Sequence, residues 1–328
     1  MLETSFTRLV GATAPVQSAP MPGIATLDLV AAVADAGGVG MLPAPLLSPD
    51  AMRDALDRLA RATRGVFGVS FLVPFLEPAC VEVAARGARL VEFFYGDPDP
   101  ALVKEVHGHG ALAGWQVGSL EEAAAAEGAG CDYLVAQGTE AGGHVRGATS
   151  LLPLLARVLD AARVPVLAAG GIATARELAA VLACGAGGAR MGTRFVAAAE
   201  SGAHPAYVAA LLEASAADTI VTDAFGADWP DAPHRVLRSA LEAARALSQD
   251  VAGEAEVGGL RVPVPRFSVI SPTRGSTGSV GAMALYAGES VTHVTAVRPA
   301  SAIVAELVAG AARLLAAWEG DARASGPR

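Results

Sequence analysis

Short apolar runs alternate with longer helical stretches through the first part of the chain. Apolar residues, many of them β-branched, gather in runs of four to seven positions, and Ala- and Leu-rich stretches with helical periodicity separate these runs. We predict eight strands, at residues 15–18, 39–42, 67–73, 90–95, 113–117, 133–137, 166–169 and 188–191.

The stretches between the strands carry helix start signals. Ser48 and Asp99 each precede a proline, which is the pattern of an N-cap followed by the first helical position. Ser119 and Thr174 are each followed three residues later by Glu, the spacing of a capping box. Eight successive βα units without a break predict a closed (β/α)8 TIM barrel. An open doubly wound sheet would require a glycine-rich phosphate turn after the first strand, but the sequence there is Ala-Pro-Met-Pro-Gly at 19–23.

The alternation ends after the eighth predicted strand. Residues 201–284 mix two helical stretches with Gly-, Pro- and Ser-rich segments, so we predict a small inserted cap domain there. Residues 1–200 and 285–328 would then form the barrel. A last amphipathic helix is expected over 299–318, with Ile303, Leu307, Leu314 and Leu315 on its apolar side.

Composition and charge narrow the function classes. Hydrophobic residues make up 52% of the 328 residues, yet no run reaches the roughly 18 apolar residues of a membrane span. A barrel sheet that is buried on both faces accounts for this excess. The net charge of −9 comes without a basic stripe, so nucleic acid and membrane surfaces are not expected as partners. Three cysteines without a CxxC pair and the absence of a signal peptide favour a cytoplasmic protein.

Position relative to the strands sorts the candidate residues. Active sites of such barrels lie at the carboxyl ends of the strands. Cys131 and Cys184 precede strands and are expected to be buried, inert side chains, whereas His107 and His109 are expected in a solvated turn without enough partners to hold a metal. The single lysine, Lys104, lies on a predicted helix, which argues against lysine-dependent chemistry.

The loops at the other end of the strands carry the candidate chemistry. His144 follows strand six in a glycine-rich loop and could act as a general base or proton donor, or could be a structural histidine bonded to backbone. Glu140 is a rival base, unless it is a solvated loop charge. Gly-rich turns at 168–172 and 190–195 follow strands seven and eight, where many barrels bind phosphate through backbone amides. Tight turns that need glycine only for packing are the alternative.

Several motifs in this order resemble the nitronate monooxygenase family, formerly called 2-nitropropane dioxygenases and related to FMN-dependent enoyl-ACP reductases. They are Ala-Pro-Met at 19–21, the stretch 67–74, Gln137 to His144, Gly-Gly-Ile at 170–172, Gly-Thr-Arg-Phe at 192–195 and Leu-Tyr-Ala-Gly at 285–288. The resemblance spans essentially the whole chain and implies a barrel that binds FMN noncovalently and carries a cap domain.

The resemblance also implies site residues. His144 matches the family's proposed catalytic base. The matching flavin contacts are Met21, Ser70, Gln137, Gly142, Gly143, Gly170, Gly171, Met191, Gly192 and Thr193. Two positions depart from the family: Ser70 stands where many members have Asn, and Arg146 separates the loop histidine from Gly147.

Three functions remain open from the sequence. The first is oxidation of alkyl nitronates with O₂. The second is NAD(P)H-dependent reduction of enoyl thioesters or quinones, for which Arg146, Arg190 and Arg194 could form a basic patch that docks an acidic carrier protein. The third is a non-catalytic flavin-binding module. The substrate is expected to be a small molecule, and the sequence leaves monomer and homodimer open.

Overall fold

The computed structural model describes residues 2–45, 47–257 and 260–324 of the chain. Eight parallel strands form a closed barrel, so the predicted TIM barrel is confirmed. Each strand agrees with its predicted range to within one residue at either end. The strands are β1 (Val16–Ser18), β2 (Val39–Pro43), β3 (Val66–Leu72), β4 (Leu90–Phe94), β5 (Leu112–Val117), β6 (Tyr133–Gln137), β8 (Val166–Ala169) and β9 (Gly188–Met191).

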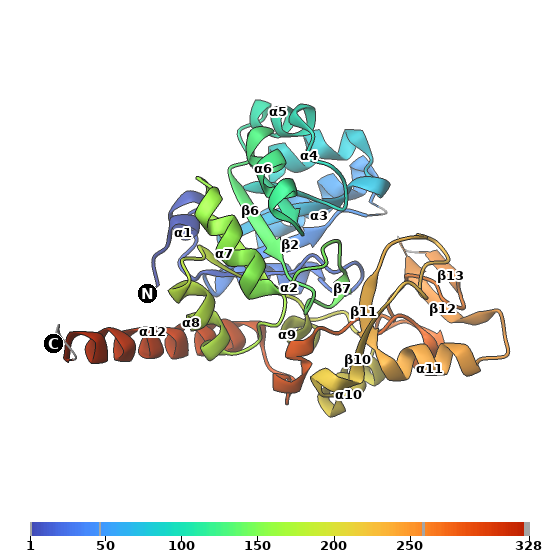
Figure 1. Ribbon diagram of the computed structural model, residues 1–328. Coiled ribbons are helices and arrows are strands. Elements are labelled where there is room, and N and C mark those ends of the chain that lie inside the picture. Colours follow the sequence, from blue (N-terminus) through green and yellow to red (C-terminus); the bar gives the residue numbers. More distant parts are fainter. Residues whose placement is uncertain (1, 46, 258–259, 325–328) are drawn as a thin grey trace.

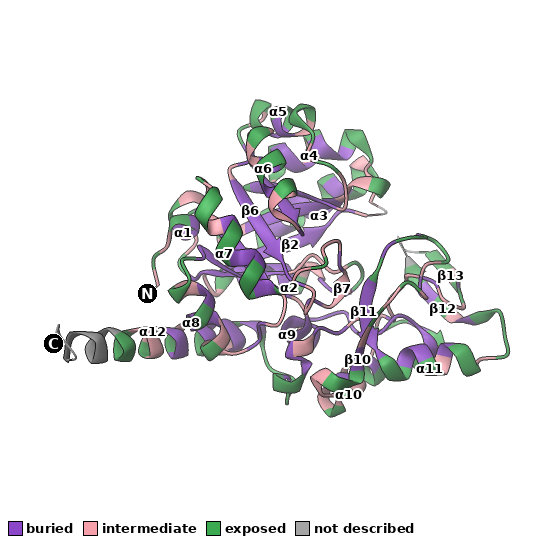
Figure 2. Ribbon diagram, in the orientation of Figure 1, coloured by how far each residue is buried: buried purple, intermediate pink, exposed green. Residues whose placement is uncertain are grey.

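Helices pack around this barrel (Figure 1). They are α2 (Leu27–Asp35), α3 (Pro49–Ala62), α4 (Pro78–Gly87), α5 (Pro100–Gly108), α6 (Leu120–Gly128), α7 (Leu151–Ala161), α8 (Ala175–Ala183) and α12 (Ala300–Ala324). The strands are almost wholly buried between the helices and the barrel interior (Figure 2), which explains the apolar composition.

Local capping follows the sequence signals closely. Thr174 and Glu177 form a reciprocal capping box at the start of α8. Ser119 accepts a hydrogen bond from the Glu122 amide, but the Glu122 carboxylate accepts from the amide of Gly118 at 2.7 Å instead of closing the box. The amino-terminal end of the barrel is filled by a short helix that the sequence analysis did not predict, α1 (Ser5–Val10), whose Phe6 and Val10 join the barrel's inner core.

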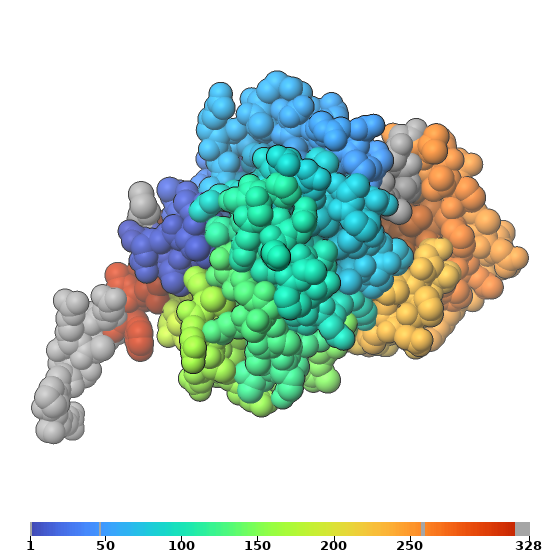
Figure 3. All heavy atoms as spheres, turned by 90° about the horizontal axis from the view of Figure 1, so that it is seen from above, coloured from blue at the N-terminus to red at the C-terminus, as the bar shows by residue number. Residues whose placement is uncertain are grey.

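The segment after β9 builds two small three-stranded sheets. The first combines β10 (Thr219–Thr222) and β11 (His234–Leu237) with β7 (Gly143–His144), and the second combines β12 (Val251–Val257), β13 (Leu260–Pro265) and β14 (Thr277–Gly278). Short helices α9 (Thr193–Val196), α10 (Pro205–Glu213) and α11 (Arg238–Ala246) accompany them. Figure 3 shows this segment, yellow to orange, on one side of the barrel. The exact limits of a cap domain at 201 and 284 stay a prediction.

Helix α12 closes the barrel between α8 and α2. By length and composition, Ala300–Trp318 could cross a membrane, but one such helix is weak evidence because core helices of soluble proteins pass the same test. Ile303, Val304 and Leu307 are buried in the main core, so α12 serves as a barrel helix. A cytoplasmic location stays a prediction.

Candidate active site

His144 lies where the barrel meets the inserted segment. It follows β6 on the short strand β7, which pairs antiparallel with β11, so that His144 stands opposite His234. The loop after the sixth barrel strand therefore serves as the edge strand of a sheet that belongs mostly to the insertion (Figure 1). Sequence reasoning placed His144 on the loop but could not anticipate this pairing.

Aromatic rings surround the imidazole of His144. Trp229 stacks on it, with ring centroids 4.2 Å apart and planes 29° apart, and His234, Tyr286 and Tyr95 lie at 5.3, 5.6 and 5.9 Å. Nε2 of His144 is buried and has no hydrogen-bond partner among the described residues. Burial, and secondarily the nearby His234, lower the pKa of His144 from 6.5 to about 3. The imidazole is therefore neutral at physiological pH.

His234 is also neutral but is fully engaged. Its Nδ1 donates to the carbonyl of Ala232 at 2.9 Å, and its Nε2 accepts from the amide of Phe225 at 3.2 Å. Because a backbone amide can only donate, Nε2 must be unprotonated. Burial lowers the pKa of His234, which favours the same state. With both nitrogens used, His234 is a structural group, whereas Nε2 of His144 is free for chemistry.

A polar layer lies inside the barrel. Gln17, Ser70 and Gln116 come from the alternate strands β1, β3 and β5, and a buried ion pair between Arg190 and Glu92 joins them. Arg190 donates to Oε1 of Gln17 from Nε at 3.0 Å and from Nη2 at 2.8 Å. Inner layers of such barrels are usually bulky and apolar, so a polar layer is unusual.

Two glutamines each present one buried, unpartnered polar atom. Since Oε1 of Gln17 accepts from Arg190, its Nε2 must face away, and it has no partner in the part of the chain that the structure describes. Gln137 donates through Nε2 to the His144 carbonyl at 2.9 Å. Its Oε1 has no hydrogen-bond partner among the described residues. A buried polar group without a partner is costly and calls for a ligand or water.

The glycine-rich loops allow backbone segments to approach one another closely. Gly170 and Gly171 have φ angles of +109° and +67°, which favour glycine, and a Cβ on Gly170 would lie 3.1 Å from the Ala141 amide. Gly142 packs against the backbone of Gly288, where a Cβ would approach the amide to 2.5 Å, while Gly143 has open space at its Cβ position.

The remaining predicted contacts come from the ends of β1, β3 and β9. A Cβ on Gly192 would lie 3.6 Å from the Met21 sulfur, so the loops after β1 and β9 are adjacent. Met191 ends β9, and the Thr193 hydroxyl accepts from the amide of Gly288 at 2.9 Å. Ser70 is buried on β3 and lies 3.5 Å from the Glu92 carboxylate, so its hydroxyl belongs to the polar layer.

The residues present fit a flavin mononucleotide. Gln137 offers a buried acceptor at the carboxyl end of β6, which suits a donor group of an isoalloxazine ring, whereas the Gln17 amide lies beside Tyr133 inside the barrel. The turns of Gly170–Gly171 and Gly192–Thr193 lie at the barrel end that binds phosphate in many such enzymes. Helix α8 adds little to a phosphate site, because the Glu177 carboxylate already accepts from the amides of Ala173 and Thr174 at 2.6 and 2.8 Å.

Two sequence-based expectations about charged residues need correction. Glu140 is neither a base nor a solvated charge, because its carboxylate accepts from the Leu151 amide at the start of α7. The basic patch does not exist as a surface. Arg190 and Arg194 are buried, and Arg146 pairs with Glu122 and with Asp97. Because Arg146 is tied down, the proposed docking of an acidic carrier loses its support.

The cysteine and histidine expectations hold only in part. Cys131 is buried, and burial raises the pKa of its thiol to about 12, but Cys184 is exposed because it caps the end of α8. His107 lies in the last turn of α5 rather than in a free turn, and its Nε2 is 2.8 Å from the Asp132 carboxylate.

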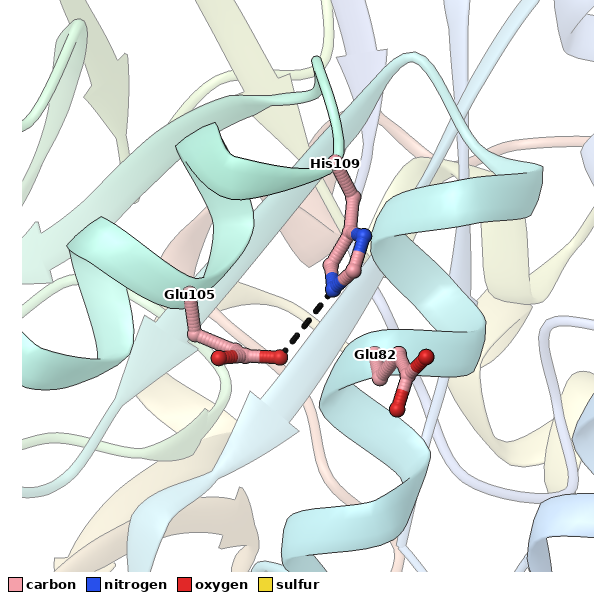
Figure 4. Close-up of side chains that lie close together, drawn as sticks. All are labelled: Glu82, Glu105 and His109. Atoms are coloured by element: carbon pink, nitrogen blue, oxygen red, sulfur yellow. Dashed lines mark hydrogen bonds and ion pairs between the residues drawn. The ribbon is translucent and has the colours of Figure 1, made fainter.

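His109 has more neighbours than its sequence spacing predicted. Figure 4 shows it beside Glu105 and Glu82, which helices α5 and α4 bring together. Nε2 of His109 lies 3.1 Å from Glu105, and the ligand atoms of all three residues lie within 4.8 Å of one another. Both glutamates are exposed, and such groups are common without an ion, so we assign no metal here.

Comparison with known proteins agrees with this geometry. A family model described as nitronate monooxygenase matches residues 3–79 and 79–310. The chain belongs to the nitronate monooxygenase family. A probable nitronate monooxygenase of Staphylococcus saprophyticus is 33% identical over 271 residues, which cover 68% of this chain and 76% of that protein. A (3aS,4S,5R,7aS)-5-hydroxy-7a-methyl-1-oxo-octahydro-1H-indene-4-carboxyl-CoA dehydrogenase of Mycobacterium tuberculosis is 34% identical over 244 residues, covering 73% of this chain and 67% of that protein.

Solved structures extend the likeness to the whole fold. FabK from Thermotoga maritima superposes with a TM-score of 0.81 at 27% identity over 98% of this chain and all of that chain. A nitroalkane oxidase from Streptomyces ansochromogenes superposes with a TM-score of 0.78 at 31% identity over 96% of this chain and all of that chain. This chain is therefore an oxidoreductase of a family that is generally flavin-dependent.

Proposed function

We propose that this protein is an FMN-dependent nitronate monooxygenase that oxidises alkyl nitronates, formed from nitroalkanes, with O₂. The observation that carries the proposal is the neutral His144, whose buried Nε2 has no partner among the described residues and lies on the loop that follows Gln137. A neutral imidazole can accept a proton, which is the step that turns a nitroalkane into its nitronate.

Each group has a separate task in this proposal. Gln137 would hold the flavin ring, and the turns of Gly170–Gly171 and Gly192–Thr193 would hold its phosphate. When bound, FMN supplies the redox chemistry that takes electrons from the substrate and passes them to O₂.

The chain's own contribution is to manage the proton and exclude water. His144 takes the α-proton through Nε2, and the aromatic surroundings keep water from the acidic carbon. The negative charge that develops on the substrate stabilises the imidazolium, which compensates for the burial that lowers the pKa of His144 beforehand.

The alternative is NAD(P)H-dependent reduction of an enoyl thioester or quinone, and the similarity to FabK favours it. In that direction His144 would have to donate a proton, for which the lowered pKa is unfavourable. The buried or paired state of Arg146, Arg190 and Arg194 also leaves no basic patch of these three residues for an acidic carrier. These two observations favour the monooxygenase.

An anaerobic flavin assay separates the two functions. The purified FMN-loaded protein is mixed without O₂ either with the nitronate of nitroethane or with NADH or NADPH, and flavin absorbance is followed. Bleaching by the nitronate alone is the expected result, and bleaching by NAD(P)H alone would overturn it in favour of the reductase. His144→Ala should retain FMN and lose the turnover of neutral nitroethane.

A further inference from the structure

Trp229 covers the imidazole of His144. The indole stacks on it at 4.2 Å, makes edge contacts with Tyr95 at 4.5 Å and Phe75 at 5.0 Å, and is only 8% exposed. His144, Tyr95 and Phe75 come from loops of the barrel, whereas Trp229 comes from the insertion, between β10 and β11. A side chain of the insertion therefore stacks on the group that we assign to proton transfer.

The loop that carries Trp229 is tied at its base. His234 accepts from the amide of Phe225 at the start of the loop and donates to the carbonyl of Ala232 at its end. Within the loop, Asp228 accepts from the Ser268 hydroxyl at 2.5 Å, and this is a contact within the insertion, not with the barrel. Residues 225–232, which we call the tryptophan loop, are thus built as one unit that meets the barrel through the Trp229 ring.

The backbone of Tyr95, whose ring contacts Trp229, is in a strained conformation. Its φ angle is +64°, a left-handed conformation that is unfavourable for a side chain of this size. Such strain persists only where the surroundings demand it, and it is concentrated at functional sites. Here it directs a phenol ring to within 5.9 Å of His144 and 4.5 Å of Trp229.

The charged groups on neighbouring elements are already engaged. Arg146 lies 5.8 Å from the Tyr95 ring but pairs with Glu122 and Asp97. Arg235 on β11 donates to the Thr139 carbonyl at 2.8 Å and pairs with Glu289. The rings of Tyr95, Trp229 and Tyr286 face His144, and we call them the apolar wall. This surface suits the hydrocarbon part of a substrate rather than a charged carrier.

We propose that Trp229 determines substrate specificity: its indole packs against the hydrocarbon chain of the substrate, whose reacting carbon faces His144. This inference rests on the proposed function for the identity of the reacting carbon. The shielding of His144 and the apolar wall do not depend on the proposed function. The substrates it selects are nitro compounds with an unbranched or flat hydrocarbon group.

The first test measures shielding without any turnover. FMN-loaded wild type, Trp229→Ala and Trp229→Phe are treated with diethyl pyrocarbonate, which acylates unprotonated imidazoles, and modification of His144 is followed by peptide mass spectrometry. His107, whose side chain is 41% exposed, serves as the internal reference. Trp318→Phe, at a tryptophan that is 63% exposed on α12, is the matched control.

His144 should react at least ten times faster relative to His107 in Trp229→Ala than in wild type, with Trp229→Phe between them and Trp318→Phe unchanged. Equal rates in wild type and Trp229→Ala would overturn the shielding role. Circular dichroism and retained FMN absorbance confirm that each variant is folded, and the Phe variant keeps the test valid if the Ala variant does not fold.

The second test measures the apolar wall by binding alone. Unbranched carboxylates from propionate to hexanoate are titrated into the oxidised protein, and dissociation constants are taken from the flavin spectrum. Affinity in wild type should rise about fourfold for each added methylene. Trp229→Ala should flatten this dependence and Trp318→Phe should not. The same slope in wild type and Trp229→Ala would overturn the specificity role, whereas a protein with this slope that does not oxidise nitronates would refute only the proposed function.

Discussion

The buried, neutral state of His144 predicts how the stability of the protein depends on pH. Its pKa is about 3 in the folded protein, against 6.5 in an exposed histidine. Below pH 6.5 the unfolded chain takes up a proton that the folded protein does not, so stability falls as pH falls until about pH 3. A buried base that stays neutral in the folded protein therefore lowers the unfolding free energy under acid conditions.

The magnitude follows from the two pKa values. From these pKa values, His144 changes the unfolding free energy by nearly zero at pH 7 and lowers it by about 2 kcal/mol at pH 5. Other groups, including a bound FMN phosphate, titrate in the same range, but they contribute equally when wild type is compared with a variant that lacks the imidazole.

The assay is urea unfolding of FMN-saturated wild type, His144→Asn and His144→Gln at pH 7 and pH 5. Between these pH values, wild type should lose about 2 kcal/mol more of its unfolding free energy than either variant. Equal losses in all three proteins would mean that His144 titrates normally in the folded state. Burial would then not hold the imidazole neutral below pH 6.5.

Three further predictions concern the rest of the site. Gln137→Leu removes the unpartnered Oε1 and should weaken FMN binding about tenfold in a fluorescence titration, while an unchanged dissociation constant would exclude Gln137 from the flavin site. Gly170→Ala must adopt a φ angle of +109° close to the Ala141 amide, so FMN affinity and thermal stability should both fall, by about 1–2 kcal/mol in unfolding free energy. Glu140→Gln weakens the acceptor at the start of α7 and should cost about 1 kcal/mol in urea unfolding while nitronate turnover is kept; loss of turnover with full stability would restore Glu140 as a catalytic candidate.

The outcome for individual residues shows which kinds of inference the sequence supports. Strand positions, the capping box of Thr174 and the placement of His144 beyond a strand end all follow from local patterns, and the structure agrees. Gln17 and Arg190 could have been noticed, because a polar residue inside a short buried strand is itself a signal. The exposure of Cys184 follows from its place at the end of α8, whereas the partner of Glu140, the Leu151 amide, depends on how the loop after β6 folds back onto the start of α7.

The amino-acid sequence by itself determined the barrel and the end of it that carries chemistry. Periodicity and capping act over a few residues, and the strand ends of a parallel barrel must share one face. Only the tertiary structure decided that β7 pairs with β11, that Trp229 stacks on His144 and that Arg190 pairs with Glu92. These contacts join residues 85 to 98 positions apart, and their energies come from burial and geometry that exist once the chain has closed.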